Sequence, residues 1–387
     1  MNKPILQIAP TPFFADRGCH IRIEGIVRCL DQLGYDNLVC TYHHGRDVET
    51  VTTRRIKPIP SYTQTAAGPS KYKLLADWRL LWLSLKEYRR LKPVAIHAHL
   101  HEGLLIGLLI KIMMFWRRTP LIADMQGSLA GELEAYGKFD GRPVLRFCTR
   151  LFERILLWFP THIVCSSPHS LSKLREEFGV PTSKSSMAQD GADEVRRMSA
   201  DEREQIRTSL RLPKDRTIVV YSGALLDSKG LVELQELIRA SDESKVHFLI
   251  IGYPREELEQ FLKQHDLQSR CTLTGQVAFV DLPDYLGACD IAVDPKNSDA
   301  GEGSGKMLNY LACGLPVLGF NTANNRDFAP DDSLLANDVN HMREQLEQLV
   351  ADERLRLTAS QTALNHFKQN YSWDITRAQL SSVYQGI

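Results

Sequence analysis

The sequence lacks the features that mark several common classes of protein. Its eight cysteines are scattered, and none belongs to a C-x-x-C pair or to a Cys/His cluster with the spacing of zinc ligands. We therefore expect free, mostly buried thiols and no metal site. No uncharged apolar run reaches the roughly 18–20 residues that span a membrane. The nearest approach, residues 103–116, is shorter and contains Lys111.

The chain also lacks an excess of either charge. Its Lys and Arg residues number 47, as do its Asp and Glu residues, which argues against general nucleic-acid binding. A hydrophobic content of 43% and a charged content of 24% are those of a soluble globular protein, and 387 residues suffice for two domains. Residues 1–9 hold no apolar segment long enough for a signal peptide, so we expect a cytoplasmic location.

Most of the functional information lies in residues 295–320, which are PKNSDAGEGSGKMLNYLACGLPVLGF. They follow an apolar run at 291–294 that predicts a strand, and they begin with a loop of small residues at 299–305. Apolar residues with helical spacing follow at 306–312, and a second buried strand is predicted at 317–320. The predicted order is therefore strand, glycine-rich loop, helix, strand.

This order of elements predicts an anion-binding site. The first amide N–H groups of a helix have no partner within the helix, and the aligned peptide dipoles place about half a positive charge at that end. Glycines in the loop allow the backbone to approach a ligand closely. We expect a phosphate or diphosphate on the amides of Gly303, Ser304 and Gly305. An ordinary strand-to-helix loop without a ligand has the same pattern.

Two polar side chains near this loop change the expected ligand from a bare phosphate to a nucleotide sugar. The carboxylate of Glu302 would repel a phosphate, but it is suited to accept hydrogen bonds from sugar hydroxyls. Asn309 follows on the predicted helix and is suited to bond a ribose hydroxyl.

The same stretch resembles the donor-binding motif of retaining glycosyltransferases with the GT-B fold, and of glycosyltransferase family 4 in particular. That motif has two glutamates separated by seven residues, then a helix and Gly-x-Pro-Val, which is similar to residues 314–317. Here Asn309 replaces the second glutamate, and six residues separate it from Glu302. The resemblance implies that Glu302 is catalytic by orienting the donor sugar, and that Leu308 and Asn309 belong to the donor site.

A second glycine loop, at 222–230, adds a cation to the predicted phosphate site. Lys229 follows a strand and a glycine loop, where it can neutralise a diphosphate leaving group. The segment is similar to one in family 4 that has an arginine after its first glycine and a lysine before its second. Gly223 is followed here by Ala224, whereas Lys229 is kept, so we count Lys229 as catalytic and Gly223 as donor-binding. The resemblance also places Val277 beside the nucleotide base. A solvated lysine at a helix start is the alternative.

The N-terminal half contains weaker signals. Its first glycine loop ends in Gly18 and lacks the full G-x-G-x-x-G of a dinucleotide site; the resemblance implies that it packs under the donor phosphates. Gln126 stands where many relatives have a histidine that contacts the donor sugar. His99, His101 and Glu102 follow a predicted strand, but nothing downstream completes a metal site.

Two predicted helices, 71–91 and 143–159, mix large apolar residues with Lys and Arg. A helix packed on a sheet with a solvated basic edge explains this composition, and contact with a membrane surface explains it too. A lipid-linked or membrane-proximal acceptor, and a peripheral location at the inner membrane face, are therefore expectations for this chain.

The resemblance implies an α/β protein with the GT-B fold, in which two Rossmann-like, doubly wound domains face a cleft. We place the acceptor-side domain at 1–195, the nucleotide-sugar domain at 196–370, and a helix returning to the first domain at 371–387. The implied activity is metal-independent transfer of a hexose from a nucleoside diphosphate sugar to an acceptor hydroxyl with retention of configuration, in glycan, glycolipid or polysaccharide biosynthesis. The sequence does not specify the base, sugar, acceptor or oligomeric state.

Two alternatives remain open at this point. A partner-binding protein that kept the fold but lost turnover would account for Ala224, Gln126 and Asn309. A sugar-nucleotide epimerase on the same fold would need a pair of catalytic carboxylates, for which Glu132 and Glu134 are poor candidates. A nicotinamide dehydrogenase is disfavoured because the dinucleotide fingerprint and its ribose-binding acid are absent.

Overall fold

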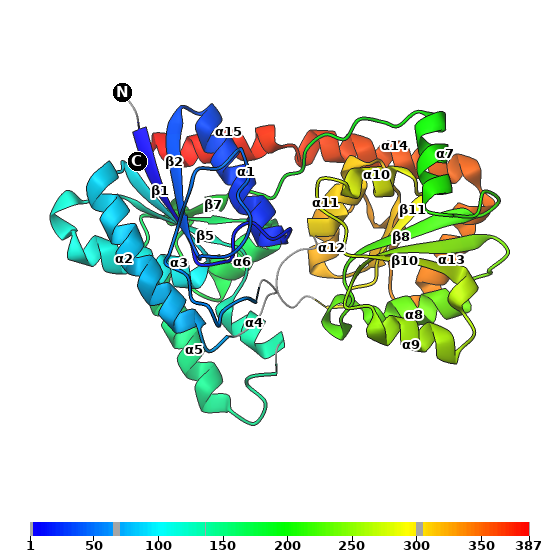
Figure 1. Cartoon of the computed structure of the whole chain (residues 1–387), viewed down its shortest axis with the longest axis horizontal. Coiled ribbons are helices and arrows are strands. Elements are labelled where there is room, and N and C mark those ends of the chain that lie inside the picture. Colours follow the sequence, from blue (N-terminus) through cyan, green and yellow to red (C-terminus); the bar gives the residue numbers. More distant parts are fainter. Residues whose placement is uncertain (1–2, 65–69, 136, 299–304, 387) are drawn as a thin grey trace. The chain divides into compact units, whose positions relative to one another are not determined.

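The computed structural model describes residues 3–64, 70–135, 137–298 and 305–386 (Figure 1). The chain divides into two compact units. The first contains Met1–Gly191 and Trp373–Ile387, and the second contains Ala192–Asp299 and Gly303–Ser372. Within the described residues, each unit is built on one parallel β-sheet.

The sheet of the first unit has the strand order β3-β2-β1-β4-β5-β6-β7. Its strands are β1 (Lys3–Ala9), β2 (Tyr35–Thr41), β3 (Thr53–Arg55), β4 (Ala95–His99), β5 (Leu121–Met125), β6 (His162–Cys165) and β7 (Ser185–Met187). The helical segments are α1 (Gly18–Gln32), α2 (Lys73–Leu91), α3 (Leu100–Met113), η1 (Phe115–Arg117), α4 (Leu129–Ala135), α5 (Pro143–Leu156), α6 (Pro168–Glu176), η2 (Thr182–Lys184) and α15 (Trp373–Gln385).

Helices cover both faces of this sheet. Successive side chains of a strand point to opposite faces. Leu6 and Ile8 of β1 therefore pack in the core under α2, α3 and α5, whereas Ile5 packs in the core under α1 and α15. Burial on both faces explains why the strands are continuous apolar runs rather than alternating ones.

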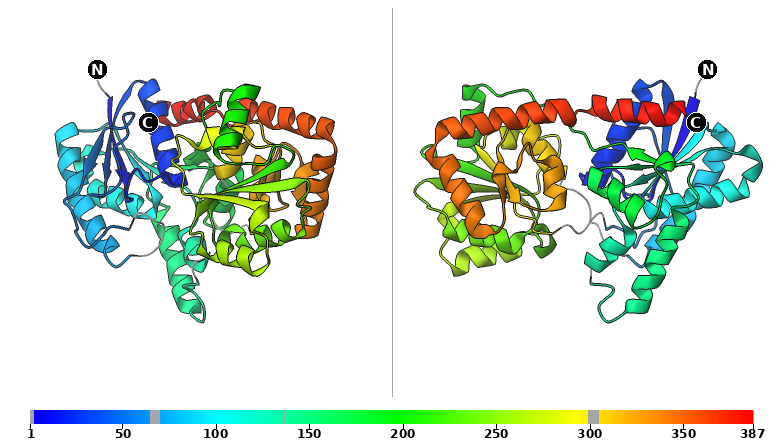
Figure 2. Two further views of the ribbon diagram at one scale, coloured as in Figure 1. Left: turned by 45° about the vertical axis from the view of Figure 1, so that its right-hand side comes forward. Right: turned by 180° about the vertical axis from the view of Figure 1, so that it is seen from behind.

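The last helix, α15, completes the first unit (Figures 1 and 2). Leu380 and Tyr384 share a core with Ile26 of α1, and the Trp373 ring lies against Gly25. A Cβ on Gly25 would be only 2.0 Å from that ring, so a side chain there would displace the helix. The predicted return of the C-terminal helix to the first domain is confirmed.

The sheet of the second unit has the order β10-β9-β8-β11-β12-β13. Its strands are β8 (Thr217–Ala224), β9 (Val246–Tyr253), β10 (Cys271–Gly275), β11 (Ile291–Asp294), β12 (Val317–Phe320) and β13 (Leu335–Ala336). The helical segments are α7 (Ala200–Ser209), η3 (Asp227–Lys229), α8 (Leu231–Ala240), α9 (Glu256–Gln264), η4 (Gln268–Arg270), α10 (Leu282–Gly287), α11 (Gly305–Ala312), α12 (Ala323–Phe328), η5 (Asp332–Leu334), α13 (Val339–Ala351) and α14 (Glu353–Asn370).

Each sheet contains a point at which the winding direction reverses. In the first unit this point lies between β1 and β4, and in the second between β8 and β11. Loops at the carboxyl ends of such neighbouring strands diverge to opposite faces, and the crevice between them is where ligands of α/β sheets bind. The fold class predicted from the sequence, two doubly wound parallel sheets, is confirmed.

Candidate functional site

The turn that carries Lys229 packs against the start of the predicted donor loop. Gly230 adopts φ = +86°, and a Cβ there would lie 2.1 Å from the carbonyl oxygen of Pro295. Only glycine allows this approach without a shift of the backbone. Lys229 itself is exposed at the end of η3. The structure therefore brings the Lys229 turn beside the segment that follows β11, at the winding reversal of the second sheet.

A second lysine, Lys306, lies beside Gly223 and was not assigned a role from the sequence. Its ammonium forms an ion pair of 2.9 Å with the buried Asp294 and stands 4.3 Å from the centre of the Tyr221 ring. Burial favours the neutral amine, but the Asp294 carboxylate outweighs this and raises the pKa of Lys306 well above its ordinary value. A Cβ on Gly223 would lie 3.8 Å from the Nζ atom of Lys306, so a fixed positive charge adjoins this glycine.

Helix α11 is held firmly against β8 by Tyr310. The Tyr310 hydroxyl accepts a hydrogen bond of 2.7 Å from the Ser222 amide. The Leu308 side chain is buried in the core of the unit. Leu308 can therefore contact a ligand only through its backbone. Gly305 begins the helix and is exposed, with open space where a Cβ would stand. Glu302, Gly303 and Ser304 lie outside the described residues.

Asn309 and the turn after β10 meet at a small pocket. The pocket is lined by Val195, Phe279, Leu282, Pro283, Leu286, Asn309 and Cys313. Val277, which precedes this turn, is half-buried and packs on the same core as α11. The residues predicted to contact the ribose and the base are thus on neighbouring segments of one unit.

The two site residues predicted in the first unit lie at different depths. Gly18 is the first residue of α1 and has open space where a Cβ would stand. Gln126 follows β5, is only 3% exposed, and donates from Nε2 to Asp124 at 3.0 Å. Its hydrogen bond with Asp124 makes Gln126 part of a buried network.

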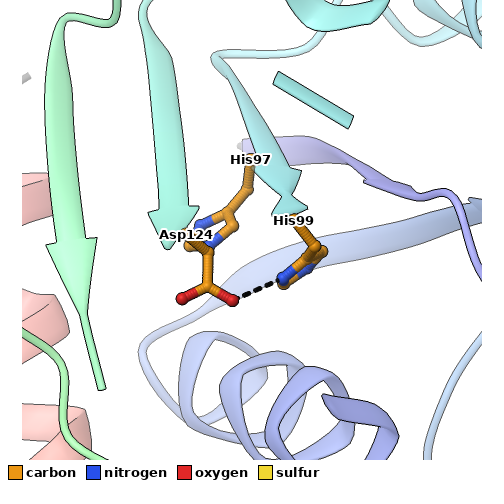
Figure 3. A group of neighbouring side chains, drawn as sticks. All are labelled: His97, His99 and Asp124. Carbon is orange, nitrogen blue, oxygen red and sulfur yellow. Dashed lines mark hydrogen bonds and ion pairs between the residues drawn. The ribbon is translucent and has the colours of Figure 1, made fainter. Parts of the chain in front are cut away.

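Arg22 and Asp124 form the centre of that network. The guanidinium donates to Asp124 at 2.9 and 2.5 Å, to the carbonyl of Ala188 at 2.6 Å and to Asp190 at 2.7 Å. His99 donates from Nδ1 to the other oxygen of Asp124 at 2.8 Å (Figure 3). Burial would raise the pKa of Asp124, but Arg22 and His99 outweigh it and hold that pKa well below its ordinary value.

His97, His99 and Asp124 place ligand atoms within 4.8 Å of one another, as a metal site requires (Figure 3). His99 and Asp124, however, already have protein partners, and Nδ1 of His97 bonds the Tyr384 hydroxyl at 2.8 Å. Both ring nitrogens of His99 face oxygen acceptors, on Asp124 and Gln7, and the Arg22 guanidinium neutralises the carboxylate. A cation would have to displace that guanidinium, so the donor set favours a structural hydrogen-bond network.

The cluster His99, His101 and Glu102 separates in the structure. His99 bonds Asp124, His101 donates to Glu153 at 3.0 Å, and Glu102 forms an ion pair with Lys73. His99 ends β4, whereas His101 and Glu102 lie in the first turn of α3, where side chains no longer follow the alternation of the strand. Proximity in the sequence therefore did not produce a shared site.

Burial of His97 predicts a defined pH dependence of stability. Burial, together with His99, lowers the pKa of His97 to about 3, whereas an unfolded histidine has a pKa of about 6.5. Between these pH values the unfolded chain binds the additional proton, so His97 alone should lower the free energy of unfolding by up to about 1.4 kcal/mol for each unit by which the pH decreases. Urea unfolding at pH 7, 6 and 5 measures this slope. His97→Asn should reduce this slope by an amount that corresponds to the uptake of nearly one proton. An unchanged slope would contradict the lowered pKa of His97.

Within the described residues, no helix is both long enough and apolar enough to cross a membrane.

Comparison with known proteins now decides the family. The family described as Glycosyl transferases group 1 matches residues 202–366, and the Glycosyl transferase 4-like domain matches residues 17–187. The chain belongs to the group 1 glycosyltransferases. The predicted membership in glycosyltransferase family 4 is confirmed, and with it the assignment to a family of retaining enzymes.

Curated members of this group match over limited lengths. The protein named as a teichuronic acid biosynthesis glycosyltransferase, TuaC, of Bacillus subtilis (strain 168) is 36% identical over 118 residues, which are 30% of this chain and 28% of TuaC. The 2-deoxystreptamine N-acetyl-D-glucosaminyltransferase of Streptomyces fradiae is 26% identical over 144 residues, 36% of this chain and 34% of that enzyme. The matches thus span about a third of each relative.

Solved structures match this group 1 glycosyltransferase over its full length. Sucrose-phosphate synthase from Thermosynechococcus elongatus has a TM-score of 0.83 at 17% identity, covering 100% of this chain and 99% of that one. Anabaena HepE in complex with UDP-glucose has a TM-score of 0.79 at 15% identity, covering 99% and 100%. At these identities the likeness establishes the fold, and it confirms the predicted GT-B architecture.

Proposed function

We propose that this group 1 glycosyltransferase moves a hexose from a nucleoside diphosphate sugar to an acceptor hydroxyl with retention of configuration. The observation that carries the proposal is the packing of the Lys229 turn on Pro295, with Lys306 beside Gly223 on the same sheet edge. The exposed Lys229 and the N-terminus of α11 then lie at the winding reversal, where α/β sheets bind phosphates, whereas the ammonium of Lys306 is paired with Asp294.

The proposed mechanism is electrostatic and positional. Lys229, the amides at 303–305 and the dipole of α11 stabilise the departing diphosphate, and Glu302 orients the donor sugar. The bond from the anomeric carbon to the diphosphate oxygen breaks as the bond to the acceptor oxygen forms, and the acceptor proton passes to the leaving phosphate. Because protein groups meet the diphosphate charge, the mechanism requires no metal. Preorganised charges of this kind lower a barrier by several kcal/mol.

The ribose is assigned to Asn309, whose amide is suited to bond a ribose hydroxyl. The base is assigned to Val277, which packs on the same core as the neighbouring residues of α11. We place UDP-sugars first among the possible donors because HepE, a structural neighbour, is described in complex with UDP-glucose. The acceptor is proposed to be lipid-linked or membrane-proximal in a glycan or polysaccharide pathway, with the enzyme at the cytoplasmic membrane face. The name of TuaC, a teichuronic acid biosynthesis glycosyltransferase, supports the biosynthetic role, and the composition of α2 and α5 supports the membrane placement.

Thermal unfolding with a panel of nucleoside diphosphates tests the donor site. A ligand at about 100 times its dissociation constant adds roughly 2.7 kcal/mol to the stability of a protein that binds it only when folded. We expect one diphosphate, UDP first, to raise the Tm of the native protein, and a much smaller shift for Lys229→Ala at the same concentration. Absence of a shift with every nucleotide would refute the donor-site assignment.

Hydrolysis of the donor in the absence of an acceptor separates the transferase from the binding protein. A transferase with this site should release nucleoside diphosphate slowly with water as acceptor, whereas a binding protein without turnover releases none. The epimerase alternative loses support from the structure, because Glu134 forms an exposed ion pair of 3.0 Å with Arg146 and is not held in a buried, proton-transferring pair.

A further inference from the structure

Helix α5 exposes an unusually large apolar surface on the first unit. Phe147 is 66% exposed, and Trp158, just beyond the helix, is 78% exposed. The other exposed apolar residues of this segment are Val144, Leu145, Leu151, Phe152, Ile155 and Phe159. At 100° per residue they fill one broad arc of the helix surface. The N-terminal turns of α5 extend away from the sheet in both views (Figures 1 and 2).

The neighbouring helices extend this surface. Side chains of α2, α3 and α5 all pack in the core on one face of the sheet, so their outer sides face away from it together. Trp78 and Trp82 of α2 and Phe115 and Trp116 of η1 are also exposed. We call the outer sides of α2, α3, η1 and α5 the aromatic face.

The charges on the aromatic face are segregated by sign. These four elements, which the structure describes in full, contain four acids, and none is exposed: Asp77, Glu87, Glu102 and Glu153. Their exposed charged residues are all basic: Lys86, Arg89, Arg90, Arg117, Arg146, Arg150 and Arg154. A second copy of the chain would bring like charges together, whereas an anionic lipid surface complements both the charge and the aromatic side chains.

The inner side of α5 is connected to the N-terminus of α4, which follows β5. Glu153 is 1% exposed, and its carboxylate accepts hydrogen bonds from the amides of Leu129 and Ala130 at 2.9 and 3.1 Å. It also accepts from the hydroxyl of Ser128 at 3.1 Å and from His101 at 3.0 Å. One helix therefore presents its apolar arc to solvent, and with its opposite side it fixes residues 128–130, which begin two positions after Gln126.

We propose that the aromatic face docks on an anionic lipid bilayer through α5, and that docking orders the 128–130 segment through Glu153. The inference deepens the proposed function, because it names the surface that reaches a membrane-proximal acceptor, and it rests on that function for its effect on transfer. Apolar residues of α5 enter the headgroup region, and Arg150 and Arg154 bind lipid phosphates at its edge. The fixed helix then holds the amides of Leu129 and Ala130 on the Glu153 carboxylate.

Vesicle co-sedimentation without sugar donor tests the docking. The native protein should bind vesicles of phosphatidylcholine mixed with phosphatidylglycerol, and bind pure phosphatidylcholine far more weakly. Phe147→Ser with Leu151→Ser should reduce binding by on the order of 10-fold or more, and Arg150→Gln with Arg154→Gln by about 10-fold at low salt. The matched control is Leu355→Ser with Leu357→Ser, two exposed leucines of α14 in the second unit, which should bind as the native protein does.

Three results would overturn the docking: no binding to anionic vesicles, unchanged binding of the Phe147→Ser/Leu151→Ser protein, or a native dimer that this variant dissociates. Because the vesicle assay contains no donor, a native protein that transfers sugar but does not bind anionic vesicles refutes only the docking. A native protein that binds the vesicles but transfers no sugar refutes only the proposed function.

Amide hydrogen exchange tests the coupling. Vesicles should slow exchange at Leu129 and Ala130 in the native protein, while Glu153→Gln should bind vesicles equally and show a smaller slowing. Exchange that is unaffected by vesicles in the native protein would refute the coupling, whatever the variant does.

Discussion

Replacing Lys229 by alanine is expected to lower kcat for sugar transfer by about 10²- to 10³-fold. This is the range observed when one preorganised charge or donor that stabilises a developing anion is removed. Lys229 is exposed and its side chain supports no core, so the folded structure should be retained. Steady-state assays with the donor selected by thermal unfolding measure the effect, and unfolding curves of the variant without ligand verify its stability.

The matched control for Lys229 is Lys263→Ala in the last turn of α9. Lys263 is an exposed lysine of the same unit and lies in no predicted site, so its removal should leave kcat within about twofold. Lys229→Arg should retain part of the activity, because the charge is kept while the geometry changes. Equal activity of the native protein and Lys229→Ala would show that the departing diphosphate is stabilised elsewhere.

Replacing Arg22 by leucine is expected to lower the free energy of unfolding by about 3–5 kcal/mol. Breaking a buried ion pair leaves an uncompensated charge, which costs this much, and Asp124 is fully buried. The variant also leaves the Ala188 carbonyl and Asp190 without the donor they share. Urea unfolding monitored by circular dichroism measures the change.

A second-site variant distinguishes loss of the ion pair from loss of packing. Adding Asp124→Asn to Arg22→Leu removes the buried charge, so the double variant should be more stable than Arg22→Leu alone. Arg343→Leu removes an arginine from an exposed pair with Glu347 and should cost only about 0.3–0.5 kcal/mol. If Arg22→Leu cost no more than Arg343→Leu, the network would not be a source of stability.

The apolar runs of the sequence predicted the sheets well because burial on both faces makes such strands unmistakable. The predicted strands at 291–294 and 317–320 coincide with β11 and β12. The doubly wound order of the strands was also predictable, because a strand, a glycine loop and a helix can return to a parallel sheet in few ways. Short elements with little apolar character, such as β3 and β7, gave no comparable signal.

The candidate site was less predictable, because its geometry depends on residues far apart in the chain. Lys306 lies beside Gly223 only because β8 and β11 pair, and neither local pattern indicates this. Glu153 looks like one charge among the arginines of α5, yet it accepts hydrogen bonds from the first amides of α4. The predicted roles of Glu302, Gly303 and Ser304 stay predictions, because these residues lie outside the part of the chain that the structure describes.

The position of α15 has a consequence for how the protein is made. Leu380 and Tyr384 fill a core that also contains Ile26 and Leu30, yet a ribosome synthesises them only after the whole second unit. Domains generally fold as units during synthesis, the N-terminal one first. Here the whole second unit must emerge before the first can close its core. In the interval the apolar residues of α1 that α15 later covers stay open to solvent.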